Sequence, residues 1–200
     1  MTTEATRKPR ADVLRNRALI LETAQRHFLQ HGVNTSLDAI AREASIGPGT
    51  LYRHFPTREA LLAAVLQTRS EELAQRQTAA EQLEAPLEAL QTWLSALEDY
   101  LGSFSGLPEP LMAAARASES DNPLTRPCTE LIDTTGQFLG AAQQSGHARS
   151  DLTGRDLFLG VAAVAWVRGA DRTEGTSLAG LRRLMAEGYQ QPTRTTGETA

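Results

Sequence analysis

Residues 46–55 read IGPGTLYRHF, with two glycines and a proline directly before a tyrosine, an arginine and a histidine. Proline suits the first turn of a helix, so Pro48 predicts a short helix that runs to about His54. Leu51 and Phe55 lie four residues apart and share one face of that helix, which we expect to anchor it to neighbouring helices. The polar side chains on its other face are then left to meet a partner.

A second short helix is predicted just before it, at about residues 37–44. Thr35, Ser36 and Asp38 mark its start, in a Thr-x-x-Asp arrangement that is similar to a capping box. Only about three residues, Ser-Ile-Gly, separate the two helices. This is the spacing of a helix-turn-helix, in which the second helix enters the major groove of DNA.

The residue types of the second helix fit contact with DNA. Gly47 and Gly49 remove side-chain bulk where the start of the helix must approach a phosphate or a base edge, and the free backbone N–H groups there attract an anion. Arg53 carries the fork of donors that reads guanine O6 and N7. The hydrogen-bonding side chains suited to phosphate oxygens are Thr50, Tyr52 and His54. An alternative stays open, because GPGT is also a common turn and Tyr52 alone could be a partly buried core residue.

Charge is unevenly distributed along the chain. The net charge of −4 argues weakly against a nucleic-acid partner. Residues 1–66, however, carry a net charge of +3, and the rest of the chain carries −7. A basic N-terminal part is expected when only that part meets phosphate, although a solvated charged face also explains most such differences.

Apolar residues recur at helical spacing along nearly the whole chain, and no segment shows a convincing alternating strand pattern. The sequence therefore predicts an all-α fold of about nine helices. The first is expected to begin near Asp12, to end at Gly32 and to bury one stripe of residues. That stripe consists of Leu14, Ala18, Leu21, Ala24 and Phe28.

The remaining helices follow from caps and breakers. Thr57 is expected to cap a single long fourth helix, whose apolar residues are Leu61, Leu62, Val65, Leu66 and Leu73. Pro86 predicts the start of a fifth, and Thr153 with Asp156 predicts a cap for an eighth. The helices after the fourth are predicted at about residues 86–104, 109–118, 123–145, 154–170 and 177–189.

Two longer stretches carry a family resemblance: TAQRHFLQHGVNTSLDAIAREASI at residues 23–46 and GTLYRHFPTREALLAAV at residues 49–65. Around them the chain resembles the DNA-binding domain of the tetracycline-repressor (TetR) family of bacterial regulators. The resemblance implies an all-α homodimer with an N-terminal arm and helix-turn-helix DNA-binding domain at residues 1–57, followed by a linking helix and a C-terminal ligand-binding and dimerisation domain at residues 58–190. Residues 191–200 lack large apolar side chains, so we expect a flexible tail there.

The family pattern also implies which residues meet DNA. It places Pro48, Gly49 and Arg53 nearest the bases, and makes Arg58 a phosphate contact from the start of the fourth helix. Contacts to the DNA backbone are implied for Thr50, Tyr52 and His54. The full predicted DNA-binding set is Ser36, Arg42, Gly47, Pro48, Gly49, Thr50, Tyr52, Arg53, His54 and Arg58.

The chain departs from the family pattern at three positions in or beside this set. Ser45 stands in the turn where glycine is usual, at a position that often needs a positive φ. Gly47 stands where serine is frequent, so a capping hydroxyl is missing. Arg58 replaces the usual lysine, and either cation can serve a phosphate.

The C-terminal part carries candidate ligand-binding and dimer residues. Aromatic side chains could surround an apolar cavity for a small-molecule effector, or could form plain core. These residues are Trp93, Tyr100, Phe104, Phe138, Phe158 and Trp166. The helix at residues 154–170 is apolar nearly all round, which favours a second subunit as one of its partners, with a fully buried core of one chain as the alternative. The predicted dimer interface is Leu157, Val161, Val164, Ala165, Leu181, Leu184 and Met185.

Length and composition narrow the class of protein. The 200 residues are 40% hydrophobic and 22% charged, as in ordinary globular proteins. The longest nearly unbroken apolar run, residues 157–167, is too short for a membrane span, which needs about 20 residues. The first residues do not resemble a secretion signal, and Cys128 is the only cysteine. We therefore expect a cytoplasmic protein without a membrane partner.

Other chemistry has little support. His27 and His31 are spaced to share a metal but lack a clear third ligand, and Cys128 lacks an activator and a resolving cysteine. No nucleophile–base pair or phosphate loop stands out, so we predict no enzyme, no metal and no cofactor. The predicted function is a transcriptional regulator, most simply a homodimeric repressor that leaves a palindromic operator when an effector binds. A regulator without an effector, or a helical enzyme or carrier, remains as an alternative.

Overall fold

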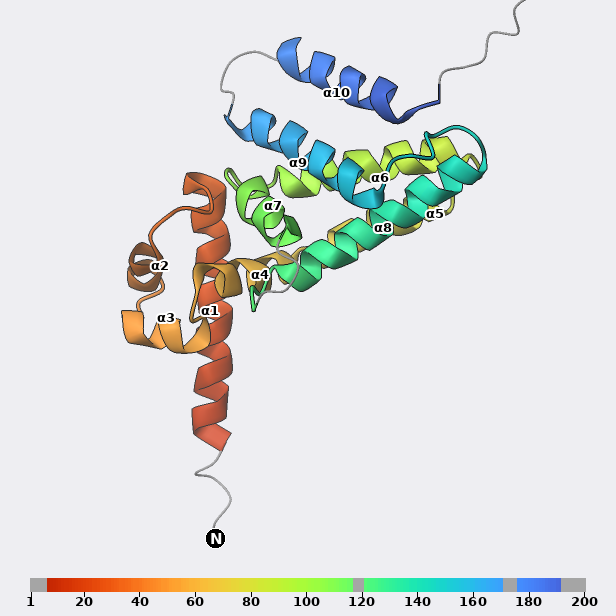
Figure 1. Cartoon of the computed structure of the whole chain (residues 1–200). Coiled ribbons are helices and arrows are strands. Elements are labelled where there is room, and N and C mark those ends of the chain that lie inside the picture. Colours follow the sequence, from red (N-terminus) through yellow and green to blue (C-terminus); the bar gives the residue numbers. More distant parts are fainter. Residues whose placement is uncertain (1–6, 117–120, 171–175, 192–200) are drawn as a thin grey trace, which may run out of the picture.

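The computed structural model describes residues 7–116, 121–170 and 176–191. These residues form ten α-helices and no strand, in agreement with the predicted all-α class, and one isolated bridge pairs Ala148 with Gln190. In chain order the helices are α1 (Arg7–His31), α2 (Leu37–Glu43), α3 (Pro48–His54), α4 (Arg58–Thr68), α5 (Ser70–Glu81), α6 (Pro86–Leu101), α7 (Pro108–Arg116), α8 (Thr125–Gln144), α9 (Gly154–Ala170) and α10 (Thr176–Tyr189). We call α1–α3 the head and α5–α10 the body, with α4 between them (Figure 1).

The head is built on the second half of α1. Ile20, Ala24 and Phe28 are fully buried there, and α2, α3 and α4 lie beside that half of the helix (Figure 1). The predicted start of the stripe is wrong, because Leu14 and Ala18 are exposed. The helix also begins earlier than Asp12, so its first turns extend beyond the packed head. Its predicted end is confirmed, since Gly32 follows His31 with a φ of 76°.

The predicted fourth helix is divided in two at Arg69, which has a φ of −104° and a ψ of −2°. Thr57 caps α4 as expected, with its hydroxyl accepting from the Ala60 N–H at 3.1 Å. Leu61, Leu62 and Val65 bury one face of α4 in the same core as α1, and α4 then leads directly into the body. The helix that links the head and the body is therefore short, and the break at Arg69 separates it from α5.

The body is a bundle in which α6, α8 and α9 run side by side (Figure 1). The predicted cap of α9 is confirmed, since the Thr153 N–H donates to the Asp156 carboxylate at 2.9 Å and the Asp156 N–H donates to the Thr153 hydroxyl at 3.3 Å. Charged groups join the helices around Glu98 of α6, whose buried carboxylate accepts from Arg182 of α10 at 2.6 Å and from Arg168 of α9 at 3.4 Å.

Some predicted features fall outside the described residues. These are most of the N-terminal arm, the last two residues of the helix expected at 109–118, and residues 192–200 of the tail. Among the helices that the structure describes, none is both long and apolar enough to cross a membrane.

Candidate nucleic-acid interface and ligand cleft

One left-handed residue and two backbone hydrogen bonds form the turn between α2 and α3. Ser45 adopts the left-handed conformation, with a φ of 54°, at the position where glycine is usual. Its N–H donates to the Arg42 carbonyl at 3.0 Å, and the Ile46 N–H donates to the Ala41 carbonyl at 3.0 Å. These two bonds satisfy the last carbonyls of α2 in the manner of a Schellman motif. The helix-turn-helix geometry is therefore kept without glycine.

The start of α2 is capped by Ser36, and the expected Thr35–Asp38 box does not form. The Ser36 hydroxyl accepts from the Ala39 N–H at 3.4 Å, while the Thr35 hydroxyl lies 3.4 Å from Nδ1 of His27. Ser36 and Arg42 are both exposed, at opposite ends of α2. The cap therefore begins one residue later than the sequence pattern indicated.

One face of α3 is buried and the other is open. Leu51 and Phe55 are buried, as the spacing predicted, whereas Tyr52 is 44% exposed and Arg53 is exposed. Thr50 and His54 are half-buried at the edges of the exposed face. A polar, solvent-facing stripe on a helix of seven residues is the surface that a major groove can receive.

The glycines at the start of α3 are not required by the chain's own packing. A Cβ added at Gly47 or Gly49 would meet nothing within 4 Å, and neither residue has a positive φ. Gly47, Pro48 and Gly49 are all exposed. The absence of bulky side chains therefore leaves the N-terminus of α3 open to an incoming phosphate or base edge.

Two arginines of the predicted set are engaged within the protein. Arg53 donates from Nε to the Gly49 carbonyl of its own helix at 3.0 Å. Arg58 donates to the carbonyls of Val33 and Thr35, both at 2.6 Å, and is half-buried. Arg58 thus ties the start of α4 to the turn between α1 and α2. Both bonds come from Nη1, so a phosphate contact would use the other N–H donors of the guanidinium.

A cation that the sequence analysis missed lies beside α3. The guanidinium of Arg17 sits over the Phe55 ring, 5.2 Å from its centroid, and Arg17 is exposed. The two residues are far apart in the chain, so no local spacing indicated this contact. Arg17 adds a positive charge next to the end of the candidate recognition helix.

The buried His27 joins α1 to α2. Its Nε2 lies 2.6 Å from a carboxylate oxygen of Glu43, whose other oxygen accepts from Arg26 at 2.9 Å. His31 is near, with ring centroids 5.5 Å apart. Within the described ranges, no three His, Cys, Asp or Glu side chains are grouped so that they could hold a metal ion.

The six aromatic residues predicted to surround an effector are not all brought together. Trp93 stacks on Phe138 at 5.6 Å, and its indole N–H donates to the buried Thr135 hydroxyl at 3.0 Å. Phe104 packs against Phe28 of the head, and Phe158 is fully buried. Trp166 is 44% exposed and donates to Glu109 at 3.1 Å. The set is therefore divided. Trp93 and Phe158 are closely packed and buried, as in the plain-core alternative, whereas Trp166 is exposed.

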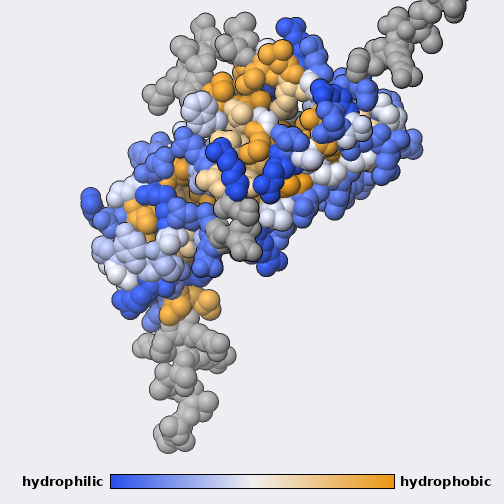
Figure 2. Space-filling model, in the orientation of Figure 1, coloured by the Kyte–Doolittle hydropathy of each residue, from blue (hydrophilic) through white to orange (hydrophobic). Residues whose placement is uncertain are grey.

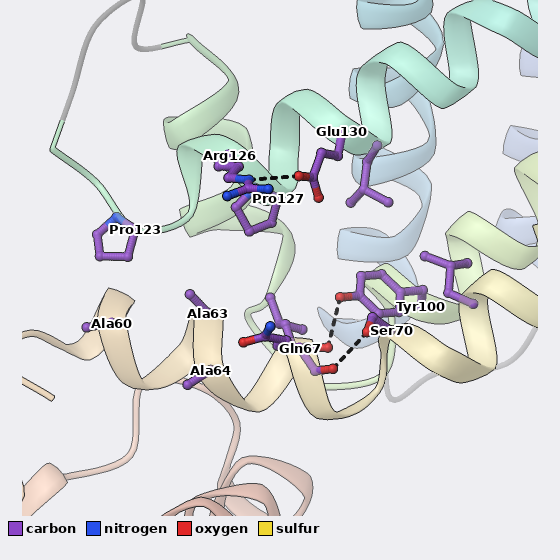
Figure 3. A pocket seen from close by; sticks show the side chains of 13 residues that line it. Ala60, Ala63, Ala64, Gln67, Ser70, Tyr100, Pro123, Arg126, Pro127 and Glu130 are labelled. Atoms are coloured by element: carbon purple, nitrogen blue, oxygen red, sulfur yellow. Dashed lines mark hydrogen bonds and ion pairs between the residues drawn. The ribbon is translucent and has the colours of Figure 1, made fainter. Parts of the chain in front are cut away.

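Tyr100 instead lines a cleft of about 550 Å³ between α4 and the start of α8 (Figure 3). Small side chains of α4 form one wall, and Arg126, Pro127 and Glu130 of α8 lie across from them. Burial raises the pKa of Tyr100 to about 12, so its hydroxyl stays neutral. Leu66, Leu73 and Leu131 add apolar surface. The cleft can hold a molecule with a mainly apolar body and a few polar groups.

The predicted dimer residues on α9 are buried within one chain. Leu157, Val161, Val164 and Ala165 are at most 4% exposed, because α6, α7, α8 and α10 already surround that helix. They therefore offer no surface to a second copy, and the single-chain alternative holds for them. On α10, Leu184 is 68% exposed, while Leu181 and Met185 are half-buried.

The comparisons with known proteins agree with this architecture. Residues 20–65 match the family model for bacterial regulatory proteins of the tetR family, and residues 85–190 match the C-terminal domain of SbtR-like transcriptional regulators. The HTH-type transcriptional regulator SAB2452 of Staphylococcus aureus (strain bovine RF122 / ET3-1) is 46% identical over 59 residues. That match spans 29% of this chain and only 32% of the relative.

Two solved structures extend the likeness to most of the chain. The TetR transcriptional regulator SCO0520 from Streptomyces coelicolor is 30% identical, with 88% of this chain and 99% of that chain covered and a TM-score of 0.56. The ketosteroid transcriptional regulator KstR2 of Mycobacterium tuberculosis shares the fold at 20% identity, with 88% and 95% covered and a TM-score of 0.55. The chain therefore belongs to the TetR family and is a transcriptional regulator with a DNA-binding helix-turn-helix.

Proposed function

We propose that this regulator is a repressor that binds a palindromic operator as a homodimer and leaves it when a small molecule binds the body. In this proposal residues 1–57 bind DNA, and residues 58–190 bind the effector and the second subunit. The observation that carries the proposal is the open face of α3, where three exposed residues with little or no side-chain bulk precede Tyr52 and Arg53. Tyr52 and His54 contact phosphates, and Arg53 exchanges the Gly49 carbonyl for a base edge.

The outer face of α9 and α10 supports a second subunit as partner. Trp166 and Ala163 on α9 are exposed, with Leu159 half-buried one turn earlier on the same face. Leu184 of α10 is the most exposed of the large apolar side chains that the structure describes. Apolar surface gathers over these two helices (Figure 2). In a homodimer this surface is covered, and two copies of α3 meet half-sites about 34–36 Å apart.

The cleft between α4 and α8 is the place we assign to the effector. Ala60, Ala63 and Ala64 leave room on the α4 side, and the opposite face of that helix holds the head. A ligand that widens the cleft therefore moves α4 together with α1–α3. The head also touches the body at a second place, where the Val33 N–H donates to the Ser105 carbonyl at 2.9 Å. Ligand and operator then favour different positions of the head, which couples their binding.

A gel shift tests the DNA part of the proposal. We expect the protein to retain DNA that flanks its own gene at a salt concentration where unrelated DNA of equal length is released. Equal retention of both DNAs at every salt concentration would contradict operator binding. Binding to neither DNA would leave the chain without its proposed function and favour a carrier or enzyme.

The effector part is tested with a filled cleft. Ala63→Leu places extra side-chain volume in the cleft, whereas Thr68→Leu adds it at an exposed position of α4 that does not line the cleft. A metabolite that raises the melting temperature of the wild type should do the same for Thr68→Leu and not for Ala63→Leu. The same shift in both variants would place the effector elsewhere, and no shift across a broad panel would favour a regulator without an effector.

A further inference from the structure

A second, smaller pocket lies between the end of α1 and the helices α5 and α6 of the body. Its volume is about 270 Å³, and it shares only Leu73 and Tyr100 with the lining of the cleft between α4 and α8. Leu29 of α1 also lines it, so the head and the body both contribute to its walls. We call it the junction pocket, and its other lining residues are Arg69, Glu72, Arg76, Ala96, Asp99 and Ser103.

Arg69 places a cation in the junction pocket, at the break between α4 and α5. Its guanidinium lies over the Phe104 ring, 5.4 Å from the centroid, and its side chain is 25% exposed. The nearest acidic partner is Glu72, at 3.7 Å, which is beyond hydrogen-bond distance. Within the described part of the chain this is the one ion pair of Arg69, so its fork of N–H donors is free to bind a carboxylate.

The acidic groups of the pocket leave little for a cationic ligand. One oxygen of the Asp99 carboxylate accepts from Arg76 at 2.9 Å, and the other accepts from Arg168 at 2.9 Å. The Glu72 side chain is 72% exposed and therefore well solvated. An incoming cation would have to displace an arginine from Asp99, whereas an incoming anion meets Arg69 directly.

The Ser103 hydroxyl lines the same pocket. Its oxygen is buried, and among the residues that the structure describes it has no hydrogen-bonding partner. Buried hydroxyls nearly always have a partner, and this one is free to donate to an anion that Arg69 binds. Leu29, Leu73 and Ala96 add apolar surface. One cation, one hydroxyl and a few apolar side chains suit a small carboxylic acid with a short apolar part.

We propose that the junction pocket is a second small-molecule site, which binds a small monocarboxylic acid through Arg69 and Ser103. Because Leu29 belongs to α1 and Ser103 follows α6, the bound acid contacts the head and the body at once. It therefore favours one position of the head and changes the affinity for the operator. This effect on the operator rests on the proposed function, whereas the binding of the acid does not.

The test measures the melting temperature and the affinity by calorimetry, at neutral pH and constant ionic strength, for acetate, butyrate and benzoate. Each acid is compared with its amide, which has a similar shape and no charge. At least one acid should raise the melting temperature of the wild type more than its amide does. Gel shifts with that acid should show a changed affinity for the operator.

Two variants remove the proposed contacts. Arg69→Gln should abolish the rise in melting temperature, measured against the variant's own value without ligand. Ser103→Ala removes only a hydroxyl and should weaken the affinity for the acid by about tenfold or more, since a hydrogen bond to a charged group is lost. Arg183→Gln, on α10 with a side chain that is 77% exposed, is the matched control and should behave like the wild type.

Two results would overturn the inference. One is that no acid raises the melting temperature of the wild type more than its amide does. The other is that Arg69→Gln and Ser103→Ala both keep the full rise, and its loss in Ala63→Leu would then place the acid in the cleft between α4 and α8. A bound acid that leaves the operator affinity unchanged would refute the coupling alone. A wild type that binds no operator would refute the proposed function and leave the binding of the acid at Arg69 intact.

Discussion

At the scale of single residues, Ser45 carries backbone strain within the helix-turn-helix. A side chain in the left-handed region costs about 1–2 kcal/mol, whereas glycine adopts that conformation freely. Ser45 nevertheless holds a φ of 54°, because the two hydrogen bonds that end α2 need that conformation. The chain thus keeps the turn of its family at a cost in stability.

Ser45→Gly should therefore increase the free energy of unfolding by about 0.5–1 kcal/mol, since the strain it removes exceeds the extra unfolded-state entropy of glycine. Urea unfolding measures the change. Ser45→Ala is the matched control, because alanine keeps the strain and removes only the hydroxyl. A Gly variant less stable than the wild type would show that Ser45 is not strained.

Cys128 and Tyr100 predict a loss of stability at alkaline pH. Burial raises the pKa of the Cys128 thiol from 9.0 to about 12, and that of Tyr100 from 10.0 to about 12. Their neutral forms therefore stabilise the fold fully below about pH 9, and this contribution falls as the pH rises toward 12, by up to about 1.4 kcal/mol per pH unit for each group. Denaturant unfolding between pH 8 and 12 should show a smaller loss for Cys128→Ala than for the wild type. Parallel curves would contradict a buried neutral thiol.

Residue identities predicted the helix-turn-helix surface better than they predicted individual contacts. Leu51 and Phe55 are buried as their spacing required, because helical periodicity is local. The contact of Arg17 with Phe55 and the two carbonyl bonds of Arg58 were missed, since each joins segments far apart in the chain. The contacts of a long cationic side chain depend on residues that are close in the fold but distant in the chain, and one sequence does not show which residues these are.

At the scale of helices, three of the predicted starts are confirmed, whereas the packing between helices was not predicted. Pro48, Thr57 and the Thr153–Asp156 pair start their helices as expected, since each cap depends on residues within one turn. The break at Arg69 had no such indication, because the surrounding sequence continues to favour a helix. The spread of the six aromatic residues was not predicted for a related reason: helical spacing shows which residues share a face, and not whether neighbouring helices fill the space between them.

The crossing of α8 and α9 depends on a glycine. A Cβ added at Gly154 would lie 2.6 Å from the Gly136 nitrogen and 2.6 Å from the Ile132 carbonyl oxygen, so the two backbones would have to separate. Gly154→Ala should lower the free energy of unfolding by about 1–3 kcal/mol, as overpacking does elsewhere. Gly140→Ala is the matched control on α8, since a Cβ there meets nothing within 4 Å and should be neutral or stabilising. Equal melting temperatures for the two variants would contradict the close crossing.

At the scale of the whole molecule, α4 joins a basic head to an acidic body. The head carries the open face of α3, and the body carries both the cleft beside α4 and the exposed apolar face of α9 and α10. Sequence alone indicated this division, through charge and the family resemblance. It did not locate the cleft, whose walls come from α4 and α8 and form only when the body packs.

The central claim is that α3 reads DNA, and operator affinity measured against salt for Tyr52→Phe and Arg53→Ala tests it most directly. Tyr52→Phe should weaken binding to every sequence alike, by about 1.5–3 kcal/mol, because the variant loses a hydrogen bond to a charged phosphate. It should keep the wild-type slope, since the neutral hydroxyl neutralises no phosphate. Arg53→Ala should weaken operator binding by about 1–3 kcal/mol and relax base preference at one position in each half-site. Wild-type affinity and slope in both variants would contradict the claim and remove α3 as the recognition helix.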